Sequence, residues 1–506
     1  MRGKREFGDY QTPAAFAERF CRFLKEHRHV APSAVVEPTC GVGNILKSSL
    51  MFQANEYYGI EINPEYCRQC RDSVSDERVK IIHADFFSFS IRPLISDKSR
   101  VLVIGNPPWV TNSTLSALDS DNLPRKANFK GLKGLDAMTG ASNFDICEYM
   151  ILRLIYEFRD TNAVIAMLCK TSVSRNIFQE LKRNGVAFSS CEMIEFSAFK
   201  VFGVHADACI LLIQLSDQAD SSDICNVYDM DDPETTKTQL VYSDGKLCCK
   251  SYAGADNFDG QCCFEWRQGI KHDCSKVMEL SVQNGMLQNG QKQTVQIEDS
   301  IVFPLIKSSM FKAPVIHSFS KYVIVTQRKA REKTEHLEKT APKTWAYLND
   351  NIKQFESRKS SIYRDAPPFS MFGVGDYSYS QYKVGVSGFY KRPLFSVLYS
   401  DDNKPVMTDD TSYFICFDSY DMAYVAMLLL NSRQVQKFLT GIAFLDAKRP
   451  YTKKVLERID FEKIVGTLTI DDLTKTERDL GLSLHVTAPM YKRFQSSLSI
   501  GQMRLS

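Results

Sequence analysis

Seven short apolar runs, separated by segments with helical patterning, set the fold of the first 215 residues. Valine and isoleucine recur in them without the polar alternation of a solvent-facing strand, so both faces of each strand are expected to be covered. The last two runs are joined by too short a segment for a crossover helix, which predicts an antiparallel pair at one edge. The runs are Ala34–Glu37, Tyr57–Glu61, Val79–His83, Val101–Ile104, Ala163–Leu168, Ser190–Phe196 and Ala208–Leu215. The pattern predicts an α/β domain with a seven-stranded, mostly parallel sheet and flanking helices.

Two helices of this domain are marked by apolar residues that recur on one face. Thr12 is the expected N-cap of the first helix, with Pro13 at the first helical position. Residues 146–158 carry the second apolar stripe.

A polar, acidic stretch from Ser216 to Glu234 predicts a linker. We therefore expect one domain over residues 1–220 and a second, α+β domain over residues 236–506. Net charge over the whole chain is only +3, but residues 303–395 hold 16 Lys and Arg against 7 Asp and Glu. This local excess of positive charge within the second domain suits a polyanionic partner.

The composition, 44% hydrophobic and 24% charged, is typical of a globular protein. No run approaches the roughly 18 apolar residues of a membrane span, and Met1–Tyr10 lacks the apolar core of a signal peptide. We expect a cytoplasmic protein without a membrane partner. The cysteines are scattered, and the Cys-x-x-Cys pair at Cys67 and Cys70 has no second pair at finger-like spacing, so no metal site is expected.

A glycine-containing loop, Glu37 to Gly43, follows the first strand run. Glycines at Gly41 and Gly43 allow the backbone to turn tightly and to approach a ligand closely. Glu61 lies twenty residues after Gly41, at the end of the second run. A carboxylate there can accept hydrogen bonds from both hydroxyls of a ribose, so the pattern predicts a nucleoside-containing cofactor.

The third run ends just before Asp85 and Phe86. Asp85 can accept a hydrogen bond from an adenine amino group, and the Phe86 ring can pack on a purine. Both lie at the carboxyl end of a strand, where open α/β sheets bind ligands. A dehydrogenase would share some of this pattern, and the segment after the fourth run separates the two possibilities.

The fourth run leads into Asn106-Pro107-Pro108-Trp109. The two prolines stiffen the backbone and lack N–H donors, so nearby carbonyl groups can point outward. The Asn106 side-chain oxygen and the Pro107 carbonyl can then accept both hydrogens of a planar amino group, while Trp109 offers a flat face for a base. Such a centre works by positioning and electrostatics, without a metal or a covalent intermediate.

This segment resembles the fourth motif of the amino-methyltransferase family, Asn/Asp/Ser-Pro-Pro-aromatic. The order of the motifs over residues 6–215 resembles the gamma group of DNA adenine-N6 methyltransferases from bacterial restriction–modification systems. The resemblance implies S-adenosylmethionine as cofactor and transfer of its methyl group to adenine N6 of a flipped-out base in double-stranded DNA. It also implies a prokaryotic cytoplasm and a separate cognate restriction endonuclease as a partner.

The resemblance assigns roles to residues outside the strand ends. Thr12, in a Thr-Pro pair before the glycine loop, is expected to help hold the methionine carboxylate of the cofactor. Phe202 is expected to stack on the flipped base together with Trp109, with Phe199 as the alternative. The expected cofactor-binding residues are Thr12, Glu37, Gly41, Gly43, Glu61, Ile62, Asp85, Phe86 and Asn106.

Basic residues in two segments are the expected DNA contacts. The polar segment after Trp109 contributes Lys126 and Lys130, and the basic region of the second domain resembles a target-recognition domain. The residues chosen there are Arg328, Lys329, Arg358, Lys359, Arg364 and Lys383.

Four alternatives remain open. The same centre could methylate cytosine N4 in DNA, or an RNA base or a glutamine amide in a protein. Some 270 residues beyond the first domain, with interleaved basic and aromatic residues, favour a DNA substrate. A non-catalytic DNA-binding module is disfavoured by the intact Asn106, Glu61 and Asp85.

Overall fold

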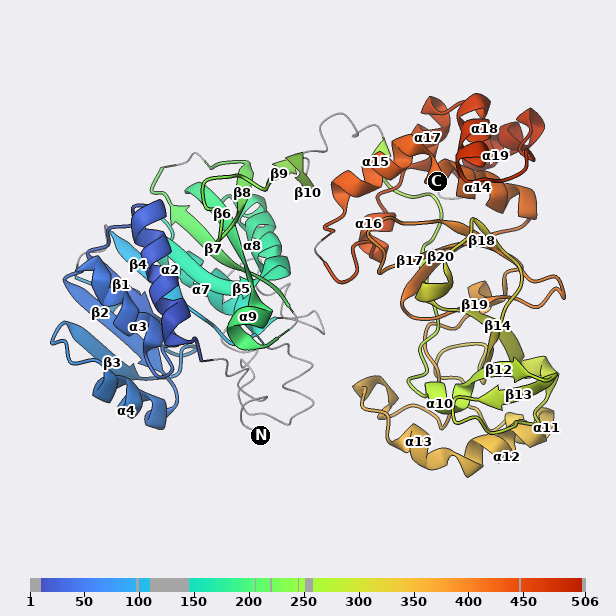
Figure 1. Cartoon of the computed structure of the whole chain (residues 1–506), viewed down its shortest axis with the longest axis horizontal. Helices are drawn as coiled ribbons and strands as arrows, with labels where there is room; N and C mark the ends of the chain where they lie inside the picture. Colours follow the sequence, from blue (N-terminus) through green and yellow to red (C-terminus); the bar gives the residue numbers. More distant parts are fainter. Residues whose placement is uncertain are drawn as a thin grey trace. The chain divides into compact units, whose positions relative to one another are not determined.

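The computed structural model describes two compact units, Met1–Ser251 (unit 1) and Tyr252–Ser506 (unit 2), which are traced in Figure 1. The described residues are 11–96, 100–109, 145–204, 206–218, 221–243, 245–250, 258–445 and 447–502. The boundary therefore lies later in the chain than the expected linker at residues 216–234. The predicted DNA contacts Lys126 and Lys130 lie outside the described residues.

Unit 1 is built on a sheet with strand order β10-β9-β8-β6-β7-β5-β4-β1-β2-β3. Strands β3, β2, β1, β4 and β5 run parallel, and β7 lies antiparallel between β5 and β6. The strands are β1 (Ala34–Glu37), β2 (Glu56–Glu61), β3 (Val79–His83), β4 (Val101–Gly105), β5 (Val164–Lys170), β6 (Phe188–Ser197), β7 (Asp207–Leu215), β8 (Ile224–Asp229), β9 (Thr238–Ser243) and β10 (Lys246–Cys249). The α/β fold and the antiparallel β6–β7 pair are confirmed, but the predicted count of seven strands is wrong.

Three further strands lie beyond β6, so the β6–β7 pair is not at the edge of the sheet. β8 pairs parallel with β6, and β9 and β10 continue antiparallel. Within β8 only Cys225 and Val227 are buried, and acidic residues surround the strand in the sequence. This short alternation was the only strand signal in a segment that otherwise has the composition of a linker.

Helices cover the sheet on both faces. In β4, Leu102 and Ile104 share one core cluster with Phe20 of α2, while Val103, which points to the opposite face, is equally buried. The helices of unit 1 are α2 (Ala14–His27), α3 (Asn44–Ser49), α4 (Pro64–Ser73), α7 (Ile146–Phe158), α8 (Thr171–Arg183) and α9 (Ala198–Phe202). Burial on both faces explains why the apolar runs lack alternation.

The start of α2 differs from the expectation. The helix begins at Ala14 with Pro13 as its N-cap residue, and no side chain caps it. Thr12 is therefore not the cap, and its hydroxyl group is used elsewhere. The second predicted stripe is confirmed, because α7 buries Ile146, Met150 and Phe158.

The described residues of unit 2 form two five-stranded sheets, ordered β11-β20-β17-β18-β15 and β13-β12-β16-β14-β19. Its strands are β11 (Arg267–Gln268), β12 (Glu279–Gln283), β13 (Met286–Asn289), β14 (Val302–Ile306), β15 (Val315–Ile316), β16 (Lys321–Ile324), β17 (Tyr382–Ser387), β18 (Ser396–Leu398), β19 (Met407–Thr408) and β20 (Ser412–Phe417). Its helices are α10 (Ser275–Met278), α11 (Leu337–Thr340), α12 (Pro342–Asp350), α13 (Ile352–Glu356), α14 (Tyr420–Asn431), α15 (Arg433–Ile442), α16 (Lys453–Leu456), α17 (Phe461–Thr467), α18 (Ile470–Asp479) and α19 (Ala488–Gln502).

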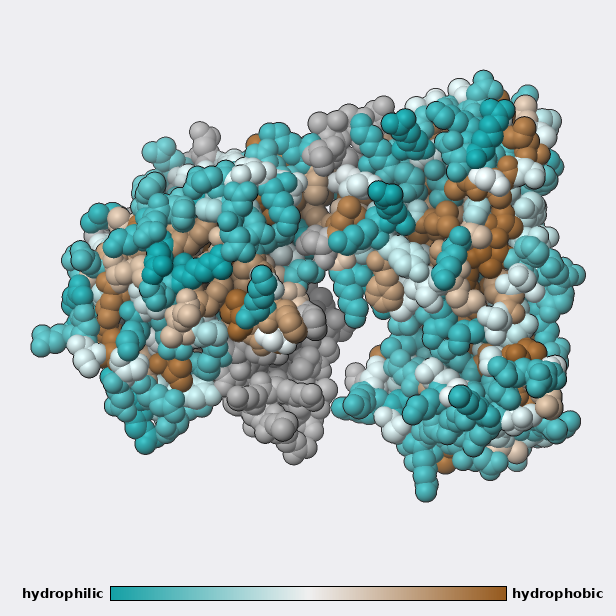
Figure 2. Space-filling model, viewed as in Figure 1, coloured by the Kyte–Doolittle hydropathy of each residue, from teal (hydrophilic) through white to brown (hydrophobic). Residues whose placement is uncertain are grey.

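Hydrophilic residues cover most of the face shown in Figure 2, with smaller hydrophobic patches among them. Within the described ranges, no helix has both the length and the apolarity required to cross a bilayer.

A buried carboxylate connects the helices in the C-terminal part of unit 2. Helix α14 buries every residue from Ala423 to Leu430, and Glu477 of α18 is fully buried next to it. Glu477 Oε1 accepts hydrogen bonds from Tyr424 Oη and from the backbone N of His485 and Val486, each at 2.8 Å. One oxygen atom thus joins α14, α18 and the segment that leads into α19.

Replacement of Glu477 by alanine should destabilise unit 2, because it leaves two backbone N–H groups and one hydroxyl group buried without an acceptor. The expected loss is about 2–4 kcal/mol in the free energy of unfolding, measured by urea denaturation. Glu477→Gln is the matched control, since its amide oxygen can still accept from the same donors. Equal losses in both variants would contradict this role for the acceptor oxygen.

Candidate active site

The carboxyl ends of four neighbouring parallel strands meet at one edge of the unit 1 sheet. β4, β1, β2 and β3 lie side by side in that order and run in the same direction. Glu37 ends β1 and Glu61 ends β2, while Asp85 and Asn106 follow β3 and β4 closely. The fold therefore brings four predicted polar residues to the edge at which open α/β sheets bind ligands.

The Glu61 carboxylate connects the end of β2 to the glycine loop. Its Oε2 accepts a hydrogen bond from Gly41 N at 2.9 Å, and its Oε1 accepts one from Asn63 N at 2.7 Å. The Asn63 side chain in turn caps α4 by accepting from Glu65 N at 2.9 Å. Two backbone N–H groups thus fix this carboxylate at the strand end.

Both glycines of the loop are required by their conformation. Gly41 has a φ of +51° and Gly43 a φ of +86°, in the left-handed region that disfavours residues with a Cβ atom. A Cβ atom on Gly41 would meet the Gln11 amide, and one on Gly43 would meet Cys70 Sγ. The loop backbone therefore lies so close to Gln11 and Cys70 that neither glycine position has room for a side chain.

The segment before α2 joins the glycine loop to the loop after β4. Gln11 Oε1 accepts a hydrogen bond from Val42 N at 3.1 Å, and the Thr12 carbonyl accepts one from Asn44 Nδ2 at 2.8 Å. Asn106 Nδ2 donates to Thr12 Oγ1 at 3.2 Å. The Thr12 hydroxyl group, which does not cap the helix, thus orients the amide of Asn106.

Glu37 lies beneath the loop rather than at its surface. Its carboxylate is buried and accepts a hydrogen bond from Leu46 N, in α3, at 2.9 Å. Burial raises the pKa of Glu37 well above its ordinary value, and the nearby Cys70 and Glu61 add to the rise, although the hydrogen bond from Leu46 opposes it. In this structure Glu37 supports the loop through α3.

Further along the same edge of the sheet lie Ile62, which directly follows β2, and Asp85 and Phe86, which follow β3. Ile62 is 46% exposed although it is apolar, whereas Phe86 is only 5% exposed. The Arg153 guanidinium lies 4.8 Å from the centre of the Phe86 ring, and its Nη1 donates to the Phe86 carbonyl. Asp85 Oδ1 accepts from Phe87 N at 2.9 Å. Ile62 therefore offers more apolar surface to a ligand than Phe86 does.

The residues after Asn106 lead into an aromatic cluster. Pro107 is buried, and Trp109 is half-buried with its Nε1 donating to the Leu168 carbonyl at 3.3 Å. The Trp109 and Phe202 rings meet edge to face, with centroids 5.5 Å apart. Phe16 also contacts Phe202, with centroids 6.2 Å apart. The structure thus brings together the two aromatic residues that the sequence assigned to base stacking.

A base cannot enter between Trp109 and Phe202 in this arrangement. Two stacking contacts of about 3.5 Å each need roughly 7 Å between the two rings, more than the 5.5 Å observed. One ring must therefore move before both can cover a base. Phe199, three residues earlier on α9, is 56% exposed.

Asp145 and Lys170 form an ion pair at the carboxyl end of β5. Lys170 Nζ lies 2.8 Å from Asp145 Oδ2, and Asp145 Oδ1 caps α7 by accepting from Cys147 N at 3.1 Å. One turn into α7, burial raises the pKa of Glu148 to about 7, although a hydrogen bond from Asn176 opposes the rise. Asp145 thus has a capping role.

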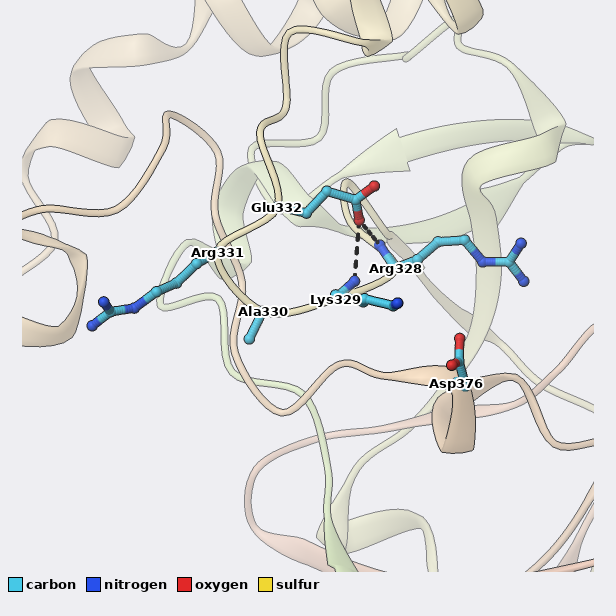
Figure 3. Close-up of a pocket in the computed structure, with 6 residues that line it drawn as sticks. All are labelled: Arg328, Lys329, Ala330, Arg331, Glu332 and Asp376. Carbon is cyan, nitrogen blue, oxygen red and sulfur yellow. Dashed lines mark hydrogen bonds between the residues drawn. The ribbon is translucent and has the colours of Figure 1, made fainter.

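The predicted DNA contacts of unit 2 fall into two groups. Arg328, Lys329, Lys359 and Arg364 are exposed, and the first two line a surface hollow (Figure 3). The other two, Arg358 and Lys383, have structural partners.

Lys383 is not available to DNA, which corrects the prediction. Its side chain is 1% exposed, and Nζ donates to the carbonyl groups of Ser378, Ser380 and Val406 at 2.7–2.9 Å. Burial lowers the pKa of the Lys383 amine to about 8. Every residue of β17 from Lys383 to Ser387 is buried, so both faces of this strand are covered, and the position of Lys383 in a basic region did not indicate its burial.

Arg358 is also used within unit 2. Its guanidinium lies 3.8 Å from the centre of the Tyr363 ring and donates to the carbonyl groups of Phe355, His272 and Ser370. Partial burial lowers the pKa of Arg358, and the nearby Tyr363, Cys274 and Asp273 oppose that effect. The contacts favour a structural role over the predicted phosphate contact.

Two residues of the unit 1 site were missed in the sequence. Gln11 holds Val42 of the glycine loop, and Arg153 holds the Phe86 backbone. Gln11 directly precedes the Thr-Pro pair, but nothing in the sequence links it to a loop 31 residues later. Arg153 is a polar residue within the apolar pattern of residues 146–158, and this exception could have indicated a role for Arg153 in the site.

The unit 1 site fits S-adenosylmethionine. Its glycine loop permits close approach of a ligand, and a fixed carboxylate stands at the end of β2 for ribose hydroxyl groups. Exposed Ile62 offers an apolar surface for the adenine ring. In the described part of the chain, no cluster of three or more His, Cys, Asp or Glu side chains could hold a metal.

Comparison with known proteins identifies the family. No family model matches the chain. It is 38% identical over 475 residues to the Type II methyltransferase M.NspV of a Nostoc species, a match that covers 92% of this chain and 98% of that protein. It is 25% identical over 148 residues to the Type II methyltransferase M.CvrRI of Paramecium bursaria Chlorella virus XZ-6E, covering 29% of this chain and 32% of that protein.

Among solved structures, the DNA-bound Type ISP restriction–modification enzyme LlaBIII matches 94% of this chain and 40% of its own, with a TM-score of 0.46 and 11% identity. A type I restriction–modification methyltransferase subunit from Streptococcus thermophilus matches 44% of this chain and 48% of its own, with a TM-score of 0.32 and 16% identity. On the near full-length match to M.NspV, the chain belongs to the type II methyltransferase family, and S-adenosylmethionine is its methyl donor.

Proposed function

We propose that this methyltransferase transfers a methyl group to adenine N6 of a flipped-out base in double-stranded DNA, as a gamma-group modification enzyme of a restriction–modification system. The observation that carries the proposal is the placement of Asn106-Pro107-Pro108-Trp109. This segment directly follows β4, next to the cofactor edge, and Asn106 is held by Thr12 of a second loop. A cognate restriction endonuclease is the expected partner in such a system.

The chain's own residues position the reacting amino group. The Asn106 side-chain oxygen and the Pro107 carbonyl accept its two hydrogens, which raises the electron density on the nitrogen. Thr12 Oγ1 accepts a hydrogen bond from Asn106 Nδ2, which fixes the orientation of the Asn106 amide. Glu61, Gly41 and Ile62 hold the cofactor, which supplies an electrophilic methyl group when bound.

The proposal is tested by transfer of a tritium-labelled methyl group from S-adenosylmethionine to unmethylated duplex DNA, followed by nucleoside analysis. Label in N6-methyl-2′-deoxyadenosine supports the proposal. Label in N4-methylcytosine keeps the mechanism and overturns the choice of base. An absence of label in DNA, with cofactor binding demonstrated separately, overturns the DNA substrate.

Replacement of Asn106 by alanine should lower the rate of methyl transfer at least ~100-fold, because one acceptor for the amino group is lost. Cofactor affinity, measured by isothermal titration calorimetry, should remain near that of the wild type. Asn106→Asp is the matched control and should keep more activity, since it preserves an acceptor oxygen and the family motif admits aspartate. Near-normal turnover of Asn106→Ala would show that the reacting centre lies elsewhere.

Replacement of Gly41 by alanine should weaken cofactor binding roughly tenfold, because the new Cβ displaces Gln11 from the loop and the backbone conformation is strained by about 1–2 kcal/mol. Gly185→Ala is the matched control. Gly185 has a similar φ of +62°, but no atom lies within 4 Å of its Cβ position. If both variants bind the cofactor equally weakly, the contact with Gln11 does not matter.

Replacement of Phe202 by alanine should weaken binding of DNA with the target base extruded by roughly 5- to 150-fold, the range that corresponds to 1–3 kcal/mol for one stacked base. Fluorescence of 2-aminopurine at the target position reports the extruded base. Phe199→Ala, on the same helix, should change this signal little. The reverse result would transfer the stacking role to Phe199, and normal cofactor binding by each variant would exclude misfolding.

A further inference from the structure

A short basic turn after β16 projects three cations from unit 2. Arg328, Lys329 and Arg331 are all exposed, and with Ala330, Glu332 and Asp376 they line a surface hollow of about 610 Å³ (Figure 3). Within the ranges that the structure describes, none of these three cations forms an ion pair. Three cations that line one hollow and form no ion pair among the described residues suit a ligand with acceptor groups.

Two side chains, those of Glu332 and Gln327, hold the backbone of this turn by hydrogen bonds. Glu332 Oε2 accepts hydrogen bonds from the backbone N of Arg328 at 2.6 Å and of Lys329 at 3.1 Å. Partial burial opposes ionisation of Glu332, but these two hydrogen bonds prevail and lower its pKa. Gln327 is buried, and its amide donates to the Glu332 carbonyl and accepts from Met371 N. These hydrogen bonds therefore fix the backbone conformation of the turn.

Arg328 is additionally oriented by an aromatic ring. Its guanidinium lies 4.7 Å from the centre of the Tyr379 ring, and Tyr379 Oη donates to the Gln327 carbonyl at 3.3 Å. A planar guanidinium held on a ring keeps its donors at the edge, where they can make two parallel hydrogen bonds. Figure 3 shows Arg328 on the same side of the turn as Asp376, while Arg331 extends in the opposite direction.

Asp376 decides which part of DNA this site suits. Its carboxylate is exposed and, among the described residues, forms no ion pair with Arg328 or another cation. A carboxylate next to the guanidinium would repel a phosphate group, but it accepts a hydrogen bond from the amino group of a base. In the major groove, guanine presents two acceptors that match arginine, and cytosine presents an amino group that matches aspartate.

We propose that Arg328 and Asp376 recognise one G·C base pair of the target sequence in the major groove, with Arg328 on guanine and Asp376 on the cytosine amino group. The inference rests on the proposed function as a DNA methyltransferase. Lys329, which lines the same hollow, serves the phosphate backbone beside this pair.

The test maps methylated sites. The full-length protein and its variants are expressed in a bacterial host without its own DNA methylation, and single-molecule sequencing of the genomic DNA gives each recognition sequence. Arg328→Ala should lose discrimination at one G·C position by roughly 5- to 150-fold, and Asp376→Ala should lose it at the same position. Arg331→Ala removes the same charge from the same turn and should leave the recognised sequence unchanged.

Arg328→Lys separates base recognition from simple attraction to DNA. It keeps the positive charge, so the salt dependence of DNA binding should match that of the wild type, while discrimination at the G·C position is lost. An unchanged recognition sequence in Arg328→Ala, with all sites methylated more slowly, would overturn the proposal in favour of a phosphate contact. Loss of discrimination at different positions in the Arg328 and Asp376 variants would overturn the pairing. If the wild type methylated no DNA, the proposed function itself would fail.

Discussion

The hydrogen bonds of the Glu61 carboxylate are the constraint on which the unit 1 site depends. This one group holds Gly41 of the cofactor loop and Asn63, which caps α4. The cofactor loop follows β1 and α4 follows β2. The loop and the helix meet because β1 and β2 are parallel neighbours. Without a carboxylate at this strand end, two backbone N–H groups at the edge would lose their acceptor, and the left-handed glycine turn would lose its anchor.

The fold of unit 1 was largely predictable because its central strands, β1, β2, β4, β5 and β7, are buried on both faces. Such strands leave unbroken apolar runs, and the sequence also predicted β3 and β6, which are less buried. β8 to β10 were missed because they carry polar residues and each buries only one or two side chains. The segment that contains β8 has the composition of a linker, so the domain boundary was placed too early.

The site was predictable where the chemistry requires a residue type at a strand end, as for Glu61, Asp85 and Asn106. It was not predictable where a contact joins distant segments. Thr12 shows the difference: its place before a proline indicated a helix cap, but its hydroxyl group instead meets Asn106, 94 residues later. Counting charges also could not separate exposed Arg328 from buried Lys383, because Arg328 lies in a surface turn whereas Lys383 lies on a strand that is buried on both faces.

The turn at residues 327–332 divides two tasks between different residues. Gln327 and Glu332 set its backbone path, whereas residues 328–331 only project from it. Substitutions at the projecting positions therefore leave the shape of the turn intact. A surface built in this way can change its specificity in single steps during evolution without passing through unstable intermediates. Relatives that recognise different DNA sequences would then diverge between the two anchors and retain the anchors themselves.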